Sequence, residues 1–176
     1  MKKVRTTGRK LIGVISDTHG LLRPEVAEVF TGVNLIIHAG DIGTADVIEE
    51  LKSIAPVIAV RGNNDKGSWA SAIPETEVAE IGGVRAYILH DLKEIGVSPA
   101  ASRFQVVISG HSHRPLIETR DEVLFLNPGS AGPRRFKLPV SVARLTIEGS
   151  VVNAKIIELT QRGGPDANKG NSRGSV

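Results

Sequence analysis

Residues 11–20 read LIGVISDTHG, an apolar run followed at once by Asp17 and His19. A short apolar run bounded by polar residues is typical of a buried β-strand. The same pattern returns at residues 35–41, LIIHAGD, and at residues 57–65, VIAVRGNND. Each run therefore predicts a strand that ends where a group of polar side chains begins.

Two helical patterns connect these strands. The first, PEVAEVF at residues 24–30, begins with a proline, which is well tolerated in the first turn of a helix. In the second, TADVIEELKSI at residues 44–54, Thr44 is a candidate N-cap and apolar residues recur on one face. Strands that alternate with helices predict a parallel sheet covered by helices.

The pattern changes after residue 76. Paired alternating segments predict three hairpins, at residues 76–90, 115–127 and 141–159. A short helix is expected at residues 98–104 and a buried strand at residues 105–110. The second half is thus expected to be mainly antiparallel, and the whole chain to be an α/β protein with two packed sheets flanked by helices.

The chain has 176 residues and no cysteine. This length fits one domain, expected over residues 10–160, with a frayed segment at 1–9 and a disordered polar tail at 161–176. The lack of cysteine excludes disulfides, thiolate zinc sites and a cysteine nucleophile. The apolar runs are too short to cross a bilayer and residues 1–16 do not form a secretory signal, so a cytoplasmic protein with no membrane partner is expected.

The net charge of +3 is unevenly distributed along the chain. Residues 1–10 and 161–176 together carry +7, so the remainder carries −4. Aromatic residues make up 3% of the chain, which leaves few platforms for stacking bases. A nucleic-acid partner is therefore not expected.

Polar groups that follow parallel strands meet in the crevice at the carboxyl ends of those strands, where α/β proteins bind ligands. Seven candidate metal ligands fall at such positions: Asp17, His19, Asp41, Asn63, His90, His111 and His113. Seven nitrogen and oxygen ligands are too many for one ion. Mixed imidazole and carboxylate donors favour manganese, iron or zinc over calcium, so a site for two divalent ions is predicted.

The motifs DTH, GD, GNND, the single His90 and GHSH, in this order, resemble the signature of the calcineurin-like metallophosphoesterase superfamily. The short length and the run NPGSAGPRR at residues 127–135 resemble its small bacterial and archaeal phosphodiesterases. The resemblance spans residues 10–160 and implies two stacked mixed β-sheets with helices on both outer faces. The set of motifs is specific, although each motif alone is weak.

The resemblance also implies how the ligands divide between two ions. Asp17, His19, Asp41 and His113 would hold the first ion. Asp41, Asn63, His90 and His111 would hold the second, so that Asp41 bridges the pair. The implied reaction is hydrolysis of a phosphoester by a hydroxide that bridges the two ions, with Asp41, Asn63 and His90 as catalytic residues. Manganese is the expected metal, and zinc, iron and nickel are the alternatives.

Several residues near these motifs have open roles. Asn64 stands where many relatives have a histidine that protonates the leaving group, and an amide has no such proton to give. Asn64 and Arg134 are candidate substrate contacts. The guanidinium fork of Arg134 fits phosphate oxygens. Asp91 replaces a common glycine and is interpreted either as a residue that orients His90 or as a solvated side chain.

Two further residues are interpreted structurally. His38 lies inside an apolar strand, which favours a buried histidine with satisfied hydrogen bonds. Asp65 is expected to order the GNND turn.

Two alternatives to a phosphodiesterase stay open at this point. One is a protein-binding scaffold of the same fold, as in a retromer subunit that resembles this superfamily but has a degraded metal site. The other is a phosphomonoesterase or nucleotide hydrolase, although the chain is short for a substrate-specific cap. A homo-oligomer is possible, and the phosphoester substrate is not identified by the sequence.

Overall fold

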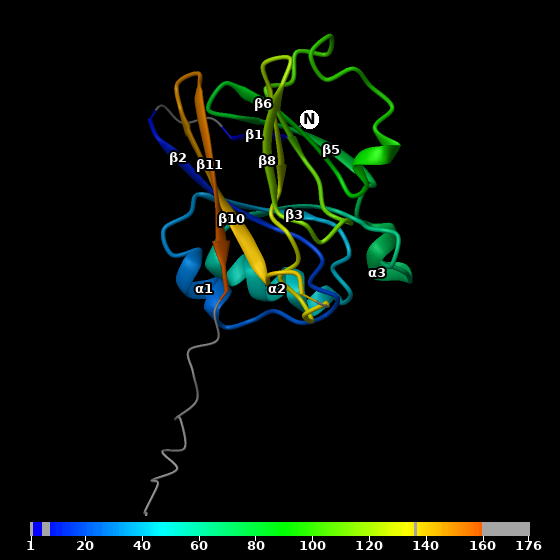
Figure 1. Cartoon of the computed structure of the whole chain (residues 1–176). Helices are drawn as coiled ribbons and strands as arrows, with labels where there is room; N and C mark the ends of the chain where they lie inside the picture. The colour runs from blue at the N-terminus through cyan, green and yellow to red at the C-terminus, as the bar shows by residue number, and fades with distance from the viewer. Residues whose placement is uncertain (1, 5–7, 136, 160–176) are drawn as a thin grey trace, which may run out of the picture.

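The computed structural model describes residues 2–4, 8–135 and 137–159, which form two stacked mixed β-sheets (Figure 1). The five-stranded sheet has the order β11 (Val151–Glu158), β10 (Ser141–Glu148), β2 (Lys10–Ile15), β3 (Leu35–Ala39) and β4 (Val57–Val60). The six-stranded sheet has the order β1 (Lys2–Val4), β5 (Thr76–Ile81), β6 (Val84–Leu89), β7 (Val106–Ile108), β9 (Val123–Asn127) and β8 (Leu116–Arg120). The two-sheet fold expected from the sequence is confirmed.

The first half of the chain has the expected strand–helix alternation. Strands β2, β3 and β4 pair in parallel, and α1 (Glu25–Val29) and α2 (Ala45–Ile54) connect them. Both helices cover the outer face of this sheet (Figure 1). Thr44 is the residue that precedes α2, in extended conformation, although its side chain makes no capping hydrogen bond.

The main core lies between the two sheets and follows from the two-residue period of a strand. Ile12 and Val14 of β2 point into it, whereas Leu11 and Ile15 point toward the helices. Aliphatic residues of both sheets complete this core, among them Leu35, Ile37, Ala86, Ile88, Val106, Ile108, Leu126 and Leu145.

The second half differs from the sequence prediction in two ways. The three hairpins are confirmed, but β7 pairs in parallel with both β6 and β9, so the sheet is less antiparallel than predicted. The helix expected at 98–104 is a series of turns. These turns and the 3₁₀ helix η1 (Leu92–Glu94) pack on the outer face of the six-stranded sheet, where Tyr87 stacks on Phe104 at 5.2 Å between ring centroids.

Two short elements were not predicted. Lys2–Val4, within the segment expected to be frayed, forms the edge strand β1 and pairs in parallel with β5. Three residues are too few to show a hydrophobic period. Pairing at a sheet edge also depends on backbone N–H and C=O groups, which a sequence pattern does not reveal. The four-residue helix α3 (Ser68–Ser71) follows the GNND turn. The predicted tail at 161–176 lies outside the described residues.

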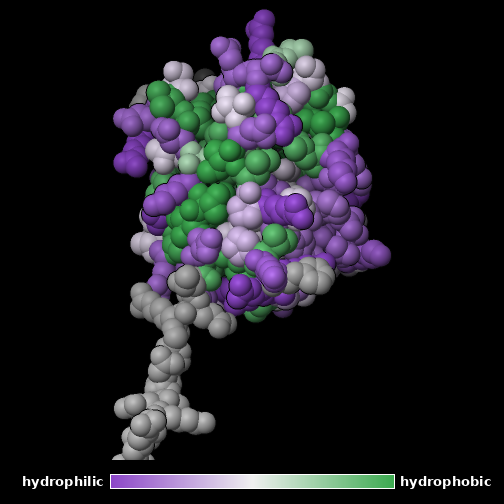
Figure 2. Space-filling model, viewed as in Figure 1, coloured by the Kyte–Doolittle hydropathy of each residue, from purple (hydrophilic) through white to green (hydrophobic). Residues whose placement is uncertain are grey.

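The face of the molecule drawn in Figure 2 shows mixed polarity. Hydrophobic and hydrophilic residues are interleaved on the face where β8 and β11 lie in front (Figures 1 and 2). No helix within the described ranges is long and apolar enough to cross a membrane.

A tight contact between β2 and α1 generates a stability prediction. A Cβ atom at Gly13 would lie 2.9 Å from the Phe30 ring, so Gly13→Ala overpacks this layer and should cost about 1–3 kcal/mol of unfolding free energy. Phe30→Ala removes the ring and with it the Cγ, Cδ1 and Cδ2 atoms that would clash. The free energy of unfolding is measured in urea for both single variants and for the double variant. The loss in the double variant should be smaller, by at least about 0.5 kcal/mol, than the sum of the losses in the two single variants. Strict additivity would contradict the contact.

Candidate metal centre

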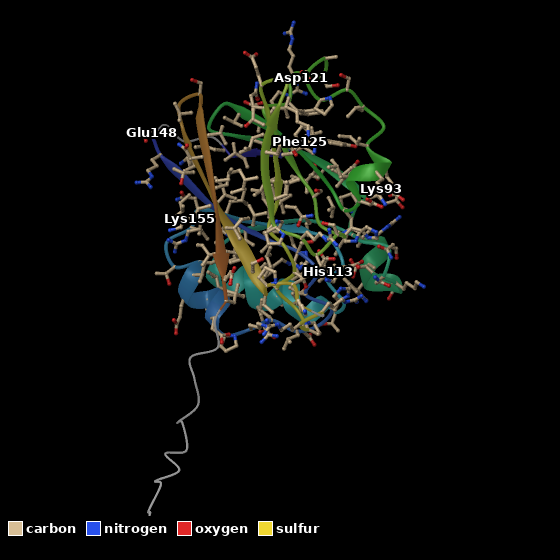
Figure 3. The ribbon with its side chains drawn as sticks, in the orientation of Figure 1. Lys93, His113, Asp121, Phe125, Glu148 and Lys155 are labelled. Carbon is tan, nitrogen blue, oxygen red and sulfur yellow. The ribbon has the colours of Figure 1, made fainter. Side chains whose placement is uncertain are left out.

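The predicted ligands all lie where strands end, at one end of the molecule. They follow β2 (Asp17, His19), β3 (Asp41), β4 (Asn63), β6 (His90) and β7 (His111, His113). Figure 3 shows His113 at the end of the molecule nearest α2, opposite the β8–β9 turn that carries Asp121. Because parallel strands of both sheets end here, residues distant in sequence become neighbours.

Backbone hydrogen bonds continue the pairing of β2 and β3 past the ends of these strands. The amide of Asp17 donates to the carbonyl of Gly40 at 3.0 Å. The amide of His19 donates to the carbonyl of Asp41 at 2.9 Å, and Gly20 donates to Ile42 at 2.7 Å. The DTHG and GDIG loops are therefore held as a continuation of the sheet.

One group of candidate ligands contains Asp17, His19 and His113. One donor atom from each lies within 4.8 Å of the other two. His113 Nε2 is 3.2 Å from Asp17 Oδ1 and 3.5 Å from His19 Nε2. Asp17 and His113 are buried, whereas His19 is partly exposed. The group therefore presents two imidazoles and one carboxylate to a common point.

A second group adjoins the first and includes Asp17, Asp41 and His90, again with donor atoms within 4.8 Å of one another. His90 Nε2 is 3.4 Å from Asp41 Oδ1. His111 Nδ1 extends the group, at 3.3 Å from His90 Nε2 and 3.2 Å from Asn63 Oδ1. All seven predicted ligands are thus brought together, and Asp17 belongs to both carboxylate–histidine groups.

This arrangement fits divalent cations. Asp17 Oδ1 is buried and makes no hydrogen bond, a costly state for a carboxylate oxygen that a cation would relieve. Mixed imidazole, carboxylate and amide oxygen donors are typical of manganese, iron or zinc sites rather than calcium sites. The residues present therefore fit a metal centre.

The local environment favours a charged Asp41 beside His90. Burial alone raises the pKa of Asp41, but hydrogen bonds from His90 and Asn64 outweigh it and lower that pKa. Burial lowers the pKa of His90, and here Asp41 and the carbonyl of Ala39 outweigh it and raise that pKa. In the protein without metal, this carboxylate and this imidazole stabilise each other.

His19 has a different balance. Burial is the largest effect and lowers its pKa, while Asp41 and Asp17 act in the opposite direction. The charge of Arg135 also lowers the pKa of His19, which places this guanidinium within electrostatic reach of the site. Arg135 and its neighbour Arg134, the one singled out from the sequence, are both exposed.

The loops that carry the ligands have an unusual backbone. Among the described residues, eight non-glycine residues have positive φ, and five of them are candidate ligands: Asp17, His19, Asp41, His111 and His113. Close packing adds to this constraint, since a Cβ atom at Gly62 would lie 2.2 Å from Asp41 Oδ1. Backbone strain of this kind clusters at functional sites.

The GNND turn holds Asp41 and its loop in place. The backbone N–H of Asn64 donates to Asp41 Oδ1 at 2.9 Å, and the side-chain Nδ2 of Asn64 donates to Asp41 Oδ2 at 2.6 Å. The buried Asp65 accepts from the amides of Gly62, Ile42 and Gly43 at 2.8, 3.1 and 2.8 Å. The predicted turn-ordering role of Asp65 is confirmed, and it extends to the GDIG loop.

His38 is a buried histidine with two satisfied ring nitrogens, as interpreted from the sequence. Its Nδ1 accepts from the amide of Gly40 at 3.2 Å. Its Nε2 lies 2.9 Å from Thr18 Oγ1, which itself donates to the carbonyl of Ile42 at 2.8 Å. Nε2 must therefore carry the proton and donate to Thr18, so a neutral His38 links the two ligand loops.

Three supporting residues were missed by the sequence analysis. Ser16 Oγ donates to Asp17 Oδ2 at 2.7 Å, and Ser130 Oγ donates to the carbonyl of Asp17 at 3.0 Å. Asn127 Nδ2 donates to the carbonyl of Gly110 at 2.6 Å, which fixes the GHSH loop. The partners of Ser130 and Asn127 lie far from them in the chain, so spacing does not mark their roles, whereas Ser16 stands next to Asp17.

Comparison with known proteins agrees with this geometry. The profile of the calcineurin-like phosphoesterase superfamily domain matches residues 11–150. The chain belongs to this superfamily. The seven candidate ligands of this calcineurin-like protein all lie within the matched region.

Two archaeal relatives have similar sequences. A probable metallophosphoesterase of Methanothermobacter thermautotrophicus is 38% identical over 162 residues, covering 84% of this chain and 91% of the relative. A phosphodiesterase of Methanocaldococcus jannaschii is 34% identical over 137 residues, covering 67% of this chain and 82% of the relative.

Solved structures show the same fold. An archaeal phosphodiesterase matches with a TM-score of 0.71 at 27% identity, covering 84% of this chain and 99% of the other. Vps29 from Chaetomium thermophilum matches with a TM-score of 0.70 at 20% identity, covering 85% of this chain and 97% of the other. The likeness to Vps29 concerns the fold alone.

The burial of His38 predicts a pH dependence of stability. Burial lowers its pKa from 6.5 to about 4, so the unfolded chain takes up the proton first as the pH falls. The stability that the neutral, buried His38 contributes is therefore present above pH 6.5 and is lost as the pH falls toward 4. Between pH 7 and pH 5 the calcineurin-like protein should lose about 2 kcal/mol of unfolding free energy through His38.

The control is His38→Gln, which cannot titrate. Urea unfolding at pH 7 and pH 5, in chelator, should show a pH effect about 2 kcal/mol smaller in this variant than in the wild type. An equal pH effect in both proteins would contradict the assignment of a neutral His38.

Proposed function

We propose that the protein is a metal-dependent phosphodiesterase that uses two divalent ions, with manganese as the first expectation and zinc, iron or nickel as alternatives. The observation that carries the proposal is the convergence of seven residues with nitrogen and oxygen donors: five form the two carboxylate–histidine groups, and Asn63 and His111 adjoin them. Membership of the superfamily and the names of the relatives support the same reaction class.

The proposed ligands divide into two overlapping sets. Asp17, His19, Asp41 and His113 hold one ion, and Asp41, Asn63, His90 and His111 hold the other. Asp41 is suited to a shared role, since Oδ2 lies 3.9 Å from His19 Nε2 while Oδ1 lies 3.4 Å from His90 Nε2. Asp41, Asn63 and His90 are the proposed catalytic residues.

Two divalent cations held here would neutralise charge on a phosphate ester and lower the pKa of water. The chain itself keeps the donors oriented: Asn64 holds Asp41, and the carbonyl of Ala39 holds His90 Nδ1 at 2.8 Å. A cavity of about 380 Å³ opens beside His90 and His111 and provides room for an ester group. Arg134 and Arg135 are proposed to meet the substrate phosphate, Arg135 with the stronger case because its charge reaches His19.

The alternatives are less well supported. A scaffold protein has no need of seven convergent donors or of a buried carboxylate oxygen without a hydrogen bond. A phosphomonoesterase or nucleotide hydrolase would use the same centre, and substrate comparison distinguishes these activities.

The first test concerns the metal. Chelated protein supplied with Mn²⁺ should bind about two ions and hydrolyse bis(p-nitrophenyl) phosphate faster than p-nitrophenyl phosphate.

Asp41→Asn should lower turnover at saturating Mn²⁺ more than about 100-fold, because it removes the charge that both ions need. The exposed Asp46 provides the matched control, and Asp46→Asn should retain turnover. Near-normal turnover of Asp41→Asn would refute the shared role.

The second test concerns the leaving group. An amide at position 64 cannot protonate a departing oxygen, so rates should fall steeply as the pKa of the leaving group rises across a series of aryl and alkyl diesters. Asn64→His introduces a candidate acid and should flatten this dependence. Asn64→Ala loses the same side-chain bond to Asp41 without adding a proton donor, and it should keep the steep slope. Equal slopes in all three proteins would contradict the proposal.

A further inference from the structure

His111 is the most exposed of the four candidate histidine ligands. Its side chain is 41% exposed, against 6% for His90 and 9% for His113. It stands between two cavities, of about 380 and 440 Å³, and lines both of them. Packing therefore holds His111 less firmly than its buried neighbours, and its orientation depends more on polar contacts.

The two ring nitrogens of His111 face in different directions. Nδ1 faces the candidate ligands, at 3.2 Å from Asn63 Oδ1 and 3.3 Å from His90 Nε2. Nε2 faces Asp91, whose Oδ2 is 3.5 Å away. A neutral imidazole that binds a cation through Nδ1 must carry its proton on Nε2, the atom that faces this carboxylate.

The carboxylate of Asp91 is itself held in place. Its Oδ1 accepts from the amide of Lys93 at 3.0 Å and so caps η1. This leaves Oδ2 directed at His111. The two segments are also tied through their backbones, since the amide of Gly110 donates to the carbonyl of His90 at 2.9 Å.

We propose that Asp91 is a positioning residue for His111, which fixes the ring orientation and the Nε2–H tautomer so that Nδ1 faces the second ion. The partner is His111 rather than His90, the residue considered from the sequence. The carbonyl of Ala39 contacts the ring nitrogen of His90 that faces away from the ion, and Asp91 takes the same position at His111. The negative charge of a carboxylate also makes the imidazole a stronger ligand for a cation. This inference rests on the proposed two-ion function.

The experiment measures metal binding directly. Wild type, Asp91→Asn and Glu94→Gln are freed of metal and titrated with Mn²⁺ against a chelator, and the absorption spectra of their Co²⁺ forms are compared. Asp91→Asn keeps an oxygen to cap Lys93 but then turns an NH₂ group toward His111, which opposes the required tautomer. Its weaker site should lose about 10- to 100-fold in Mn²⁺ affinity, and the spectrum of the second Co²⁺ ion should change.

Glu94→Gln is the matched control, because Glu94 is an exposed carboxylate that lines the same 380 Å³ cavity. It should bind both ions within about 3-fold of wild type, and the tighter site should be unchanged in all three proteins. Thermal unfolding of the metal-free proteins should be the same for wild type and Asp91→Asn, which would show that the loss of affinity is not a loss of folding.

The outcomes separate the two proposals. If wild type binds two ions and Asp91→Asn binds both as tightly with the same Co²⁺ spectrum, the role of Asp91 is refuted and the proposed function stands. An equal loss in Glu94→Gln would also refute it, since the effect would then come from the general charge of the cavity. Wild-type protein that binds no transition ion would refute the proposed function, and this inference with it.

Discussion

The continued pairing of β2 and β3 beyond the ends of the two strands is the constraint on which the site depends. Three backbone hydrogen bonds, from Asp17 to Gly40, from His19 to Asp41 and from Gly20 to Ile42, place two ligand loops side by side. His38 links the same two loops by hydrogen bonds to Thr18 and Gly40. Asp65 of the GNND turn accepts hydrogen bonds from the GDIG loop. Without this frame, the buried carboxylates of Asp17 and Asp41 would repel each other and move apart.

The fold was largely predictable because its elements have strong local patterns. The apolar runs of β2, β3 and β4, the amphipathic period of α2 and the three hairpins are each readable within a dozen residues. The parallel pairing of β7 with β6 and β9 was not predictable in this way, since it joins strands through the irregular segments that precede and follow β7. The turns at 98–104 bring Phe104 onto the sheet, where its ring is buried against Tyr87, while Ala100 and Ala101 stay exposed and give a helix no apolar face.

The candidate ligands were predictable for a related reason. Each stands directly after a strand, and strand ends converge in this fold class. The residues that support the ligands were harder to identify, because Ser130, Asn127 and Asp91 act on partners that are close only after folding. Asn64 illustrates the limit: its lack of a titratable proton is readable from the sequence, but its two hydrogen bonds to Asp41 are not.

The left-handed backbone at five candidate ligands restricts how this site can change in evolution. Each such residue costs about 1–2 kcal/mol, least for asparagine, aspartate, histidine and glycine. A lineage that no longer needed the cations would still be constrained at these positions by the chain path itself. Substitution by asparagine or glycine keeps the loops intact, whereas valine or isoleucine would disrupt them. Remnants of the ligand pattern in a protein of this architecture therefore report on loop geometry as well as on catalysis.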